Sequence, residues 1–84
     1  MKKIKLIDYF PSMGTLVDLS DPETFKETYV EGSKNVPYQK MMMYYKDLLD
    51  KKKPYYFVCS KGLHSQKAVA VLEYYGYDVT QVVR

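Results

Sequence analysis

The segment from Pro54 to Gly76 constrains the fold of this 84-residue chain more than any other. Tyr55-Tyr56-Phe57-Val58 is an unbroken apolar and aromatic run, typical of a strand covered on both faces in a parallel sheet. From residue 65 to residue 75, apolar side chains recur at the spacing of one helix face: Ala68, Val69, Leu72 and Tyr75. Gly76 stands where a left-handed C-terminal cap belongs. The pattern predicts a strand that ends at Cys59, a tight loop and a helix.

The loop between this strand and this helix contains the chain's one cysteine, Cys59, and its one histidine, His64. A loop at a helix start can direct backbone N–H groups and the positive end of the helix dipole at one point. Lys61 and His64 add positive charge if they face inward, and Gly62 allows a backbone turn that a side chain would obstruct. We therefore expect an anion site that favours the reactive thiolate of Cys59. The alternative reading of the residues is a small buried hydrophobic side chain at a strand end.

The loop Cys59-Ser60-Lys61-Gly62-Leu63-His64-Ser65 resembles the active-site loop of the rhodanese family, Cys-Arg-x-Gly-x-Arg-Ser, in which Thr is common at the sixth place. Cys59, Gly62 and Ser65 match that pattern. In the family, the cysteine carries sulfur as a persulfide.

Further matches follow in the same order along the chain. Leu16-Val17-Asp18-Leu19, followed by Asp21-Pro22-Glu23-Thr24-Phe25, resembles the family's Leu-Ile-Asp-Val-Arg-x-Pro-x-Glu-Phe segment. Val30, Gly32 and Asn35-Val36-Pro37 resemble its Ile-Pro-Gly-Ala-x-Asn-Ile-Pro segment, and Leu72 with Gly76-Tyr77 resembles its Leu-x-x-x-Gly-Tyr. The order and spacing together make the resemblance specific.

Departures from the family pattern concern mainly its charged residues. Ser60 replaces the loop arginine, His64 replaces the second arginine or threonine, and Ser20 stands where an arginine usually follows the strand. Three other residues replace the family's usual Gly, His and Pro: Thr28, Tyr29 and Glu31. The sequence ends at Arg84, where the family usually continues with Leu-x-Gly-Gly and a final helix.

The resemblance implies a rhodanese-like α/β fold with a mostly parallel central sheet flanked by helices. It implies one domain over residues 1–84, in a minimal version without the usual C-terminal extension. The implied activity is that of a sulfurtransferase, in which Cys59 takes sulfane sulfur from a donor such as thiosulfate and passes it from a persulfide to a thiophilic acceptor. The implied substrate-binding residues are those that follow Cys59: Ser60, Lys61, Gly62, Leu63, His64 and Ser65. Neither a cofactor nor a metal ion is expected.

Two other functions fit parts of this pattern. A non-catalytic protein-binding module or sulfur carrier could keep the fold while lacking the loop arginines, as Ser60 suggests. A related cysteine-based phosphatase or arsenate reductase needs an arginine after five intervening residues to bind the oxyanion bidentately. Ser65 occupies that place and cannot supply a planar fork. The phosphatase reading is therefore disfavoured.

Composition and charge indicate a cellular compartment and exclude some classes of partner. One cysteine cannot form an intramolecular disulfide, and Lys5 and Asp8 interrupt any apolar run at the N-terminus, so a reducing cytoplasm is expected. The net charge of +3 without a basic stripe argues against nucleic acid. We expect a monomer, away from membranes, with a small anionic sulfur donor and a thiol or protein acceptor.

The remaining elements follow from local patterns. Strands are expected at residues 4–7, 16–19, 35–36 and 79–83, with a helix from 21 to 29 and another from 39 to 50. Ser20 or Asp21 can cap the first helix, and Glu23 completes a capping-box pattern with Ser20. Asp18 is expected to accept backbone N–H bonds. The second helix should direct one apolar face at the core: Met41, Tyr44, Tyr45, Leu48 and Leu49.

Overall fold

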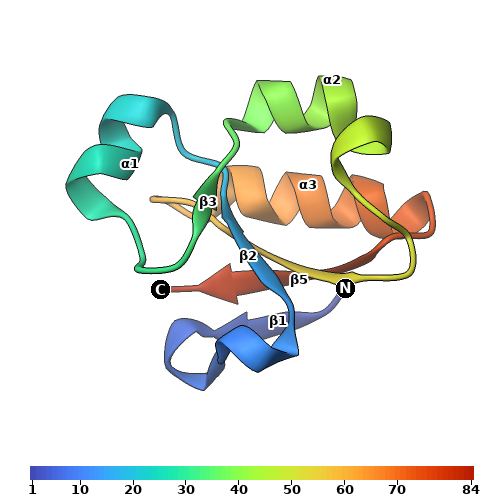
Figure 1. Ribbon diagram of the computed structural model, residues 1–84, viewed down its shortest axis with the longest axis horizontal. Coiled ribbons are helices and arrows are strands. Elements are labelled where there is room, and N and C mark those ends of the chain that lie inside the picture. The colour runs from blue at the N-terminus through green and yellow to red at the C-terminus, as the bar shows by residue number, and fades with distance from the viewer.

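Five parallel strands form the central sheet, in the order β1-β5-β4-β2-β3. The structure is a computed structural model that describes residues 1–84 (Figure 1). The strands are β1 (Lys3–Lys5), β2 (Thr15–Asp18), β3 (Lys34–Asn35), β4 (Pro54–Val58) and β5 (Asp78–Val83). The helices are α1 (Pro22–Thr28), α2 (Tyr38–Leu48) and α3 (Leu63–Tyr74), and two 3-10 turns are η1 (Leu6–Asp8) and η2 (Pro11–Met13). The expected α/β fold with a parallel sheet is confirmed.

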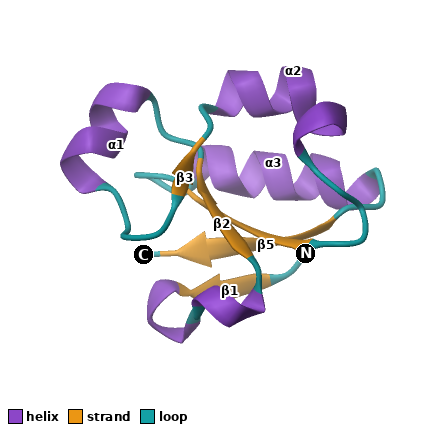
Figure 2. Ribbon diagram, in the orientation of Figure 1, coloured by secondary structure: helices purple, strands orange, loops and turns teal.

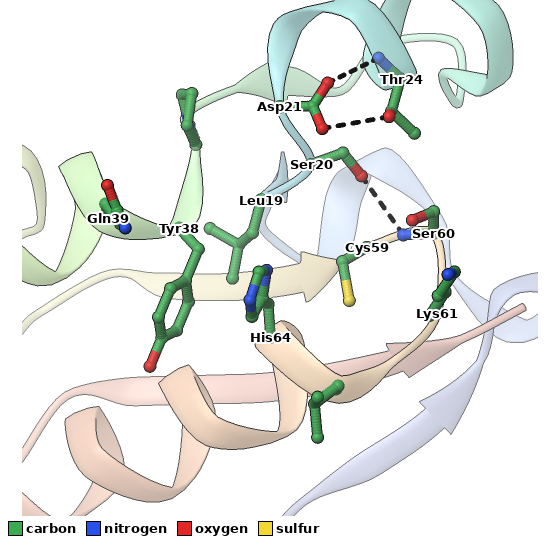
Figure 3. A pocket seen from close by; sticks show the side chains of 12 residues that line it. Leu19, Ser20, Asp21, Thr24, Tyr38, Gln39, Cys59, Ser60, Lys61 and His64 are labelled. Carbon is green, nitrogen blue, oxygen red and sulfur yellow. Dashed lines mark hydrogen bonds between the residues drawn. The ribbon is translucent and has the colours of Figure 1, made fainter.

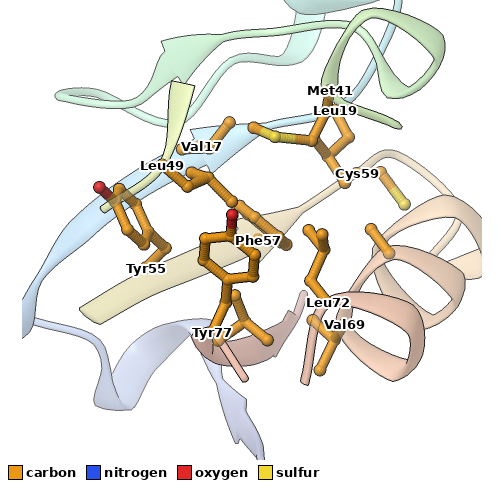
Figure 4. Packing of buried hydrophobic residues seen from close by; sticks show 12 residues of the cluster. Val17, Leu19, Met41, Leu49, Tyr55, Phe57, Cys59, Val69, Leu72 and Tyr77 are labelled. Atoms are coloured by element: carbon orange, nitrogen blue, oxygen red, sulfur yellow. The ribbon is translucent and has the colours of Figure 1, made fainter. Parts of the chain in front are cut away.

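Alternating side chains of the central strands serve two different cores. In β4 and just beyond it, Tyr55, Phe57 and Cys59 belong to the larger cluster, which includes Val69 and Leu72 of α3 (Figure 4). Helices α2 and α3 lie over this face of the sheet (Figure 2). The intervening side chains point to the other face, where the smaller cluster packs with residues of the N-terminal segment: Leu16, Val58 and Val82 with Ile4, Leu6 and Tyr9. Burial on both faces explains the unbroken apolar run of β4.

Helix α3 ends as its sequence predicts. Gly76 has a φ of +95°, and its N–H donates to the Glu73 carbonyl at 3.0 Å. The N–H of Tyr77 donates to the Leu72 carbonyl, also at 3.0 Å. These two bonds form a Schellman cap, which turns the chain from α3 directly into β5.

The apolar face expected for α2 is only partly correct. Met41 and Leu49 are buried, whereas Tyr44 and Leu48 are 49% and 39% exposed. The backbone at Tyr44 is not helical, with φ −124° and ψ 18°, so the helix is kinked there. Because the spacing rule assumes a straight helix, it assigns Tyr44, at the kink, and Leu48, after it, wrongly to the core.

The first strand is shorter than expected. It ends at Lys5, and Ile7, which the prediction included, is 83% exposed in η1. Strand β1 pairs only with β5, and the last register pair is Lys5 with Val83, where β5 itself ends. Residues after Lys5 therefore have no partner strand. None of the helices combines the length and apolar content that crossing a bilayer requires.

Of the two predicted caps of helix α1, Asp21 is the one that the structure shows, and the capping box of Ser20 with Glu23 is absent. The backbone N–H of Thr24 donates to Asp21 Oδ1 at 2.9 Å, and the Thr24 hydroxyl donates to Oδ2 at 3.2 Å. These bonds, the backbone one foremost, lower the pKa of Asp21 below its ordinary value of 3.8. The Ser20 hydroxyl does not cap α1, because it accepts the backbone N–H of Ser60 after β4.

We expect the cap of α1 to make a pH-dependent contribution to stability. The folded-state pKa of Asp21 lies below the unfolded one, so the ionised cap stabilises the fold above the ordinary pKa of 3.8, and this stabilisation is lost as the pH falls through the lowered folded-state pKa. Asp21→Ala should lower Tm at pH 7, and its difference from wild type should shrink on acidification in thermal unfolding followed by circular dichroism. Asp21→Asn keeps an acceptor that does not titrate, so its Tm advantage over Asp21→Ala should not depend on pH. A wild-type advantage that is the same at pH 7 and pH 2 would contradict this.

Candidate active site

A pocket of about 630 Å³ opens at the carboxyl ends of β2 and β4 (Figure 3). Ligands bind at this edge in open parallel sheets. Four segments form its walls: Leu19, Ser20 and Asp21 after β2, Pro37, Tyr38 and Gln39 at the start of α2, Cys59, Ser60 and Lys61 after β4, and Leu63 with His64 at the start of α3. Thr24 of α1 completes the lining.

The sulfur of Cys59 lies inside the curve of the loop, against the start of α3 (Figure 3). The residue is only 6% exposed. Its Sγ accepts the backbone N–H of Ser65 at 3.3 Å, and Ser65 Oγ lies 3.4 Å from the same sulfur. Negative charge on Sγ would therefore meet hydrogen-bond donors at the positive end of the α3 dipole.

The backbone donors of the loop are divided between two tasks. The N–H of Ser60 donates to Ser20 Oγ at 3.2 Å and so links the ends of β4 and β2. The N–H of Ser60 is therefore not among the loop donors available to an anion. The N–H groups of Lys61 and Gly62 have no acceptor within the protein, and Gly62 adopts a left-handed φ of +79°. These donors remain free for a ligand.

One wall of the pocket is an aromatic stack. The rings of His64 and Tyr38 lie 4.3 Å apart between centroids and are inclined by 11°. Figure 3 shows the His64 ring between Tyr38 and Cys59. Tyr38 comes from α2, so the stack joins two helices across the mouth of the pocket. The sequence carries no local indication of this pairing, because the two residues are remote along the chain.

Gln81 of β5 and Arg84, which follows β5, hold the loop from behind. Gln81 Nε2 donates to the Gly62 carbonyl at 3.1 Å and to Ser65 Oγ at 3.3 Å. Arg84 Nε donates to the Cys59 carbonyl at 3.4 Å. Neither residue was among those predicted from the sequence. The available indication was that Gln81 is a polar residue inside the apolar run 79–83.

A buried carboxylate completes this support. Asp18 is fully buried, and its Oδ1 accepts the N–H of Ser20 at 2.8 Å, as expected for an aspartate at a strand end. Its Oδ2 lies 3.5 Å from Nη2 of Arg84. Asp18 therefore orders the backbone at Ser20, whose hydroxyl in turn holds the N–H of Ser60. The guanidinium faces Asp18 and does not line the pocket.

Comparison with known proteins identifies the family. The family model described as rhodanese-like domain matches residues 3–84, nearly the whole chain. This chain belongs to the rhodanese-like domain family. No curated protein sequence matches it.

Three solved structures illustrate the shared fold of this rhodanese-like domain. A rhodanese-related protein from Thermoplasma volcanium has a TM-score of 0.87 at 24% identity, over 98% of this chain and 83% of that one. A rhodanese-like domain protein from Staphylococcus aureus has a TM-score of 0.79 at 28% identity, over 98% and 84%. A single-domain sulfurtransferase from Saccharomyces cerevisiae has a TM-score of 0.69 at 20% identity, over 96% and 81%.

The seven site residues predicted in the rhodanese-like loop divide into those that line the pocket and those that do not. Five of them line the pocket: Cys59, Ser60, Lys61, Leu63 and His64. Gly62 and Ser65 are not among the residues that line it. Ser65 is fully buried and contacts Sγ, so it can act on the sulfur itself but not on the rest of a bound substrate.

Proposed function

We propose that this rhodanese-like domain is a sulfurtransferase that carries sulfane sulfur as a persulfide on Cys59. The observation that carries the proposal is the position of Cys59 Sγ. It lines a pocket at the carboxyl edge of the sheet and accepts the Ser65 N–H at 3.3 Å, at the start of α3. A sulfurtransferase from Saccharomyces cerevisiae has the same fold, which supports the reaction class.

The proposed reaction consists of two displacements at sulfur. The Cys59 thiolate attacks the outer sulfur of thiosulfate, the sulfur–sulfur bond of the donor breaks, and sulfite leaves with the electron pair. An acceptor thiolate or cyanide then attacks the outer sulfur of the persulfide, and the electrons of the broken bond return to Sγ. No separate base is required if Cys59 is already ionised. The free N–H groups of Lys61 and Gly62 and the α3 dipole would hold the charge on the outer sulfur.

The substrates follow from the lining of the pocket. Lys61 and His64 are its cationic or titratable basic residues, which suits a small anionic donor. Ser60 and Ser20 offer neutral hydroxyl groups near them. A thiol, on a small molecule or on a protein, would serve as acceptor. We propose that the domain works as a monomer.

Mass spectrometry tests this proposal directly. Intact protein incubated with thiosulfate, without other reductants, should gain the mass of one sulfur atom, and cyanide should remove it and release thiocyanate. Cys59→Ser should show neither step, because Cys59 is the only thiol in the chain. Wild-type protein that gains no sulfur from thiosulfate would overturn the proposed donor.

A sulfur carrier loaded by another protein is the second candidate. The low exposure of Cys59, 6%, and a pocket lining without arginine favour it. A carrier should gain sulfur from inorganic polysulfide, a more reactive donor, while remaining unchanged by thiosulfate. The same mass measurement therefore separates the two functions, and a thiol unchanged by both donors would favour a module that only binds partners.

A further inference from the structure

Gln81 occupies an unusual position beneath the Cys59 loop. Its side chain is 5% exposed, in β5, and its Cα pairs in register with Phe57 of the neighbouring strand β4. Alternation along β5 places Gln81 on the same face as Val79, which shares a core cluster with Cys59. A buried amide on this face is therefore close to the reacting sulfur without touching it.

The orientation of the Gln81 amide is determined by its neighbours. The Gly62 carbonyl can only accept hydrogen bonds, so the group that lies 3.1 Å from it must be the NH₂. The same nitrogen lies 3.3 Å from Ser65 Oγ. The Oε1 atom of Gln81 is buried without a hydrogen-bond partner. Because an unpaired buried oxygen is destabilising, this glutamine does not maximise the stability of the loop.

The Ser65 hydroxyl has one proton and two acceptors within reach. The Gly62 carbonyl accepts it at 3.1 Å, and Cys59 Sγ, whose thiol donates to Ser65 Oγ at 3.4 Å, becomes a second acceptor once the thiol is ionised. The carbonyl, however, already accepts the N–H of Gln66 at 3.1 Å and the amide of Gln81, which together use both of its lone pairs. Because Ser65 competes with two other donors for this carbonyl, an ionised Sγ is the stronger acceptor for the hydroxyl proton.

We propose that Gln81 is a positioning residue that directs the Ser65 hydroxyl proton onto Cys59 Sγ. It acts through Ser65 and saturates the Gly62 carbonyl, the acceptor that competes with the sulfur. The bond from Ser65 stabilises the thiolate and, in the proposed reaction, the electron pair that returns to Sγ when the outer sulfur leaves. This inference rests on the proposed function only in taking Cys59 as the reacting thiol.

The test is the rate of Cys59 alkylation by iodoacetamide as a function of pH. In Gln81→Met, the Gly62 carbonyl regains a lone pair, and the Ser65 hydroxyl should turn toward it. The loss of one hydrogen bond to the thiolate should move the midpoint of the alkylation profile upward by about 0.5 to 1 pH unit. Ser65→Ala should cause a similar shift, and adding Gln81→Met to Ser65→Ala should cause no further one.

Two other variants make the test specific. Gln81→Glu keeps the size of the side chain but brings a carboxylate that accepts the Ser65 proton, so its midpoint should move upward by more than that of Gln81→Met. If circular dichroism shows that Gln81→Met does not fold, the alkylation midpoint of Gln81→Glu tests the inference instead. Thr80→Val is the matched control, because Thr80 is a buried neighbour in β5 with no contact to the loop, and its midpoint should equal that of wild type.

The surrounding charges do not account for such a shift. The charged and titratable groups at the pocket and behind the loop are unchanged in Gln81→Met and Thr80→Val: Asp18, Asp21, Lys61, His64 and Arg84. An unchanged midpoint in folded Gln81→Met would overturn the inference, and so would an equal shift when Gln81→Met is added to Ser65→Ala. Alkylation needs no sulfur donor. A wild-type protein that takes no sulfur from thiosulfate would therefore overturn the proposed donor without changing the outcome of the alkylation test.

Discussion

Replacing Phe57 by alanine is expected to lower the free energy of unfolding by about 3 to 5 kcal/mol. Phe57 is fully buried in the central strand β4, where it pairs in register with Val17 of β2 and Gln81 of β5. Its side chain packs within the larger core cluster (Figure 4). Its removal would leave a cavity that three strands and two helices cannot close without moving together. A chain of 84 residues has a total stability of only about 4 to 13 kcal/mol. The variant should therefore lose a large fraction of its stability.

Urea denaturation followed by circular dichroism measures this loss, and thermal unfolding should show a fall in Tm of about 12 °C or more. Tyr74→Ala is the matched control, since it removes an aromatic ring that is 86% exposed at the end of α3. Its free energy of unfolding should change by no more than about 0.5 kcal/mol. A similar loss in both variants would mean that the packing of β4 is not the main source of stability.

Ser60→Arg is expected to raise kcat/KM for thiosulfate by roughly five- to thirty-fold. Ser60 lines the pocket beside Cys59, and its backbone is held by the bond from its N–H to Ser20 Oγ. A guanidinium at this place would bind the anionic donor through a planar fork, whereas the serine offers one neutral hydroxyl. Exchanging a neutral contact for a charge-assisted one should stabilise the bound donor and its transition state by about 1 to 2 kcal/mol.

Steady-state kinetics at constant ionic strength would measure the gain, because screening alone changes the affinity for an anion. Ser12→Arg adds the same charge at an exposed position of η2, outside the pocket, and should leave kcat/KM unchanged. Lys61→Ala should lower kcat/KM below the wild-type value, because it removes a cationic side chain from the pocket. If Ser60→Arg and Lys61→Ala are both without effect, thiosulfate does not bind in this loop, and sulfur delivered by a protein becomes the better explanation.

The unit formed by β4, the loop and α3 could be predicted because its determinants are local. The apolar run 55–58, the glycine at 62 and the cap at Gly76 each act within a few residues of the chain. The kink of α2 at Tyr44 cannot be predicted from such local patterns. No residue in that helix is a proline or glycine, so nothing in the local pattern indicates where the apolar face changes direction.

The candidate site likewise has residues that the sequence predicts and residues that only the tertiary structure brings to it. Cys59 and the residues after it are contiguous, so their place between a strand and a helix followed from the sequence. Tyr38 reaches the pocket only because β3 leads into α2 beside the ends of β2 and β4. Gln81 was recognisable as a polar residue in an apolar strand, but its partners depend on which strand lies beside it.

The sequence by itself determined a strand, a tight loop and a helix around one cysteine, since hydrophobic periodicity, helix capping and glycine turns all act over short distances along the chain. Only the tertiary structure decided which donors and acceptors meet at Sγ. The order β5-β4-β2 brings Gln81, Ser65 and Ser20 to one edge of the sheet. That order results from the packing of whole strands and helices, and no local pattern of residues encodes it.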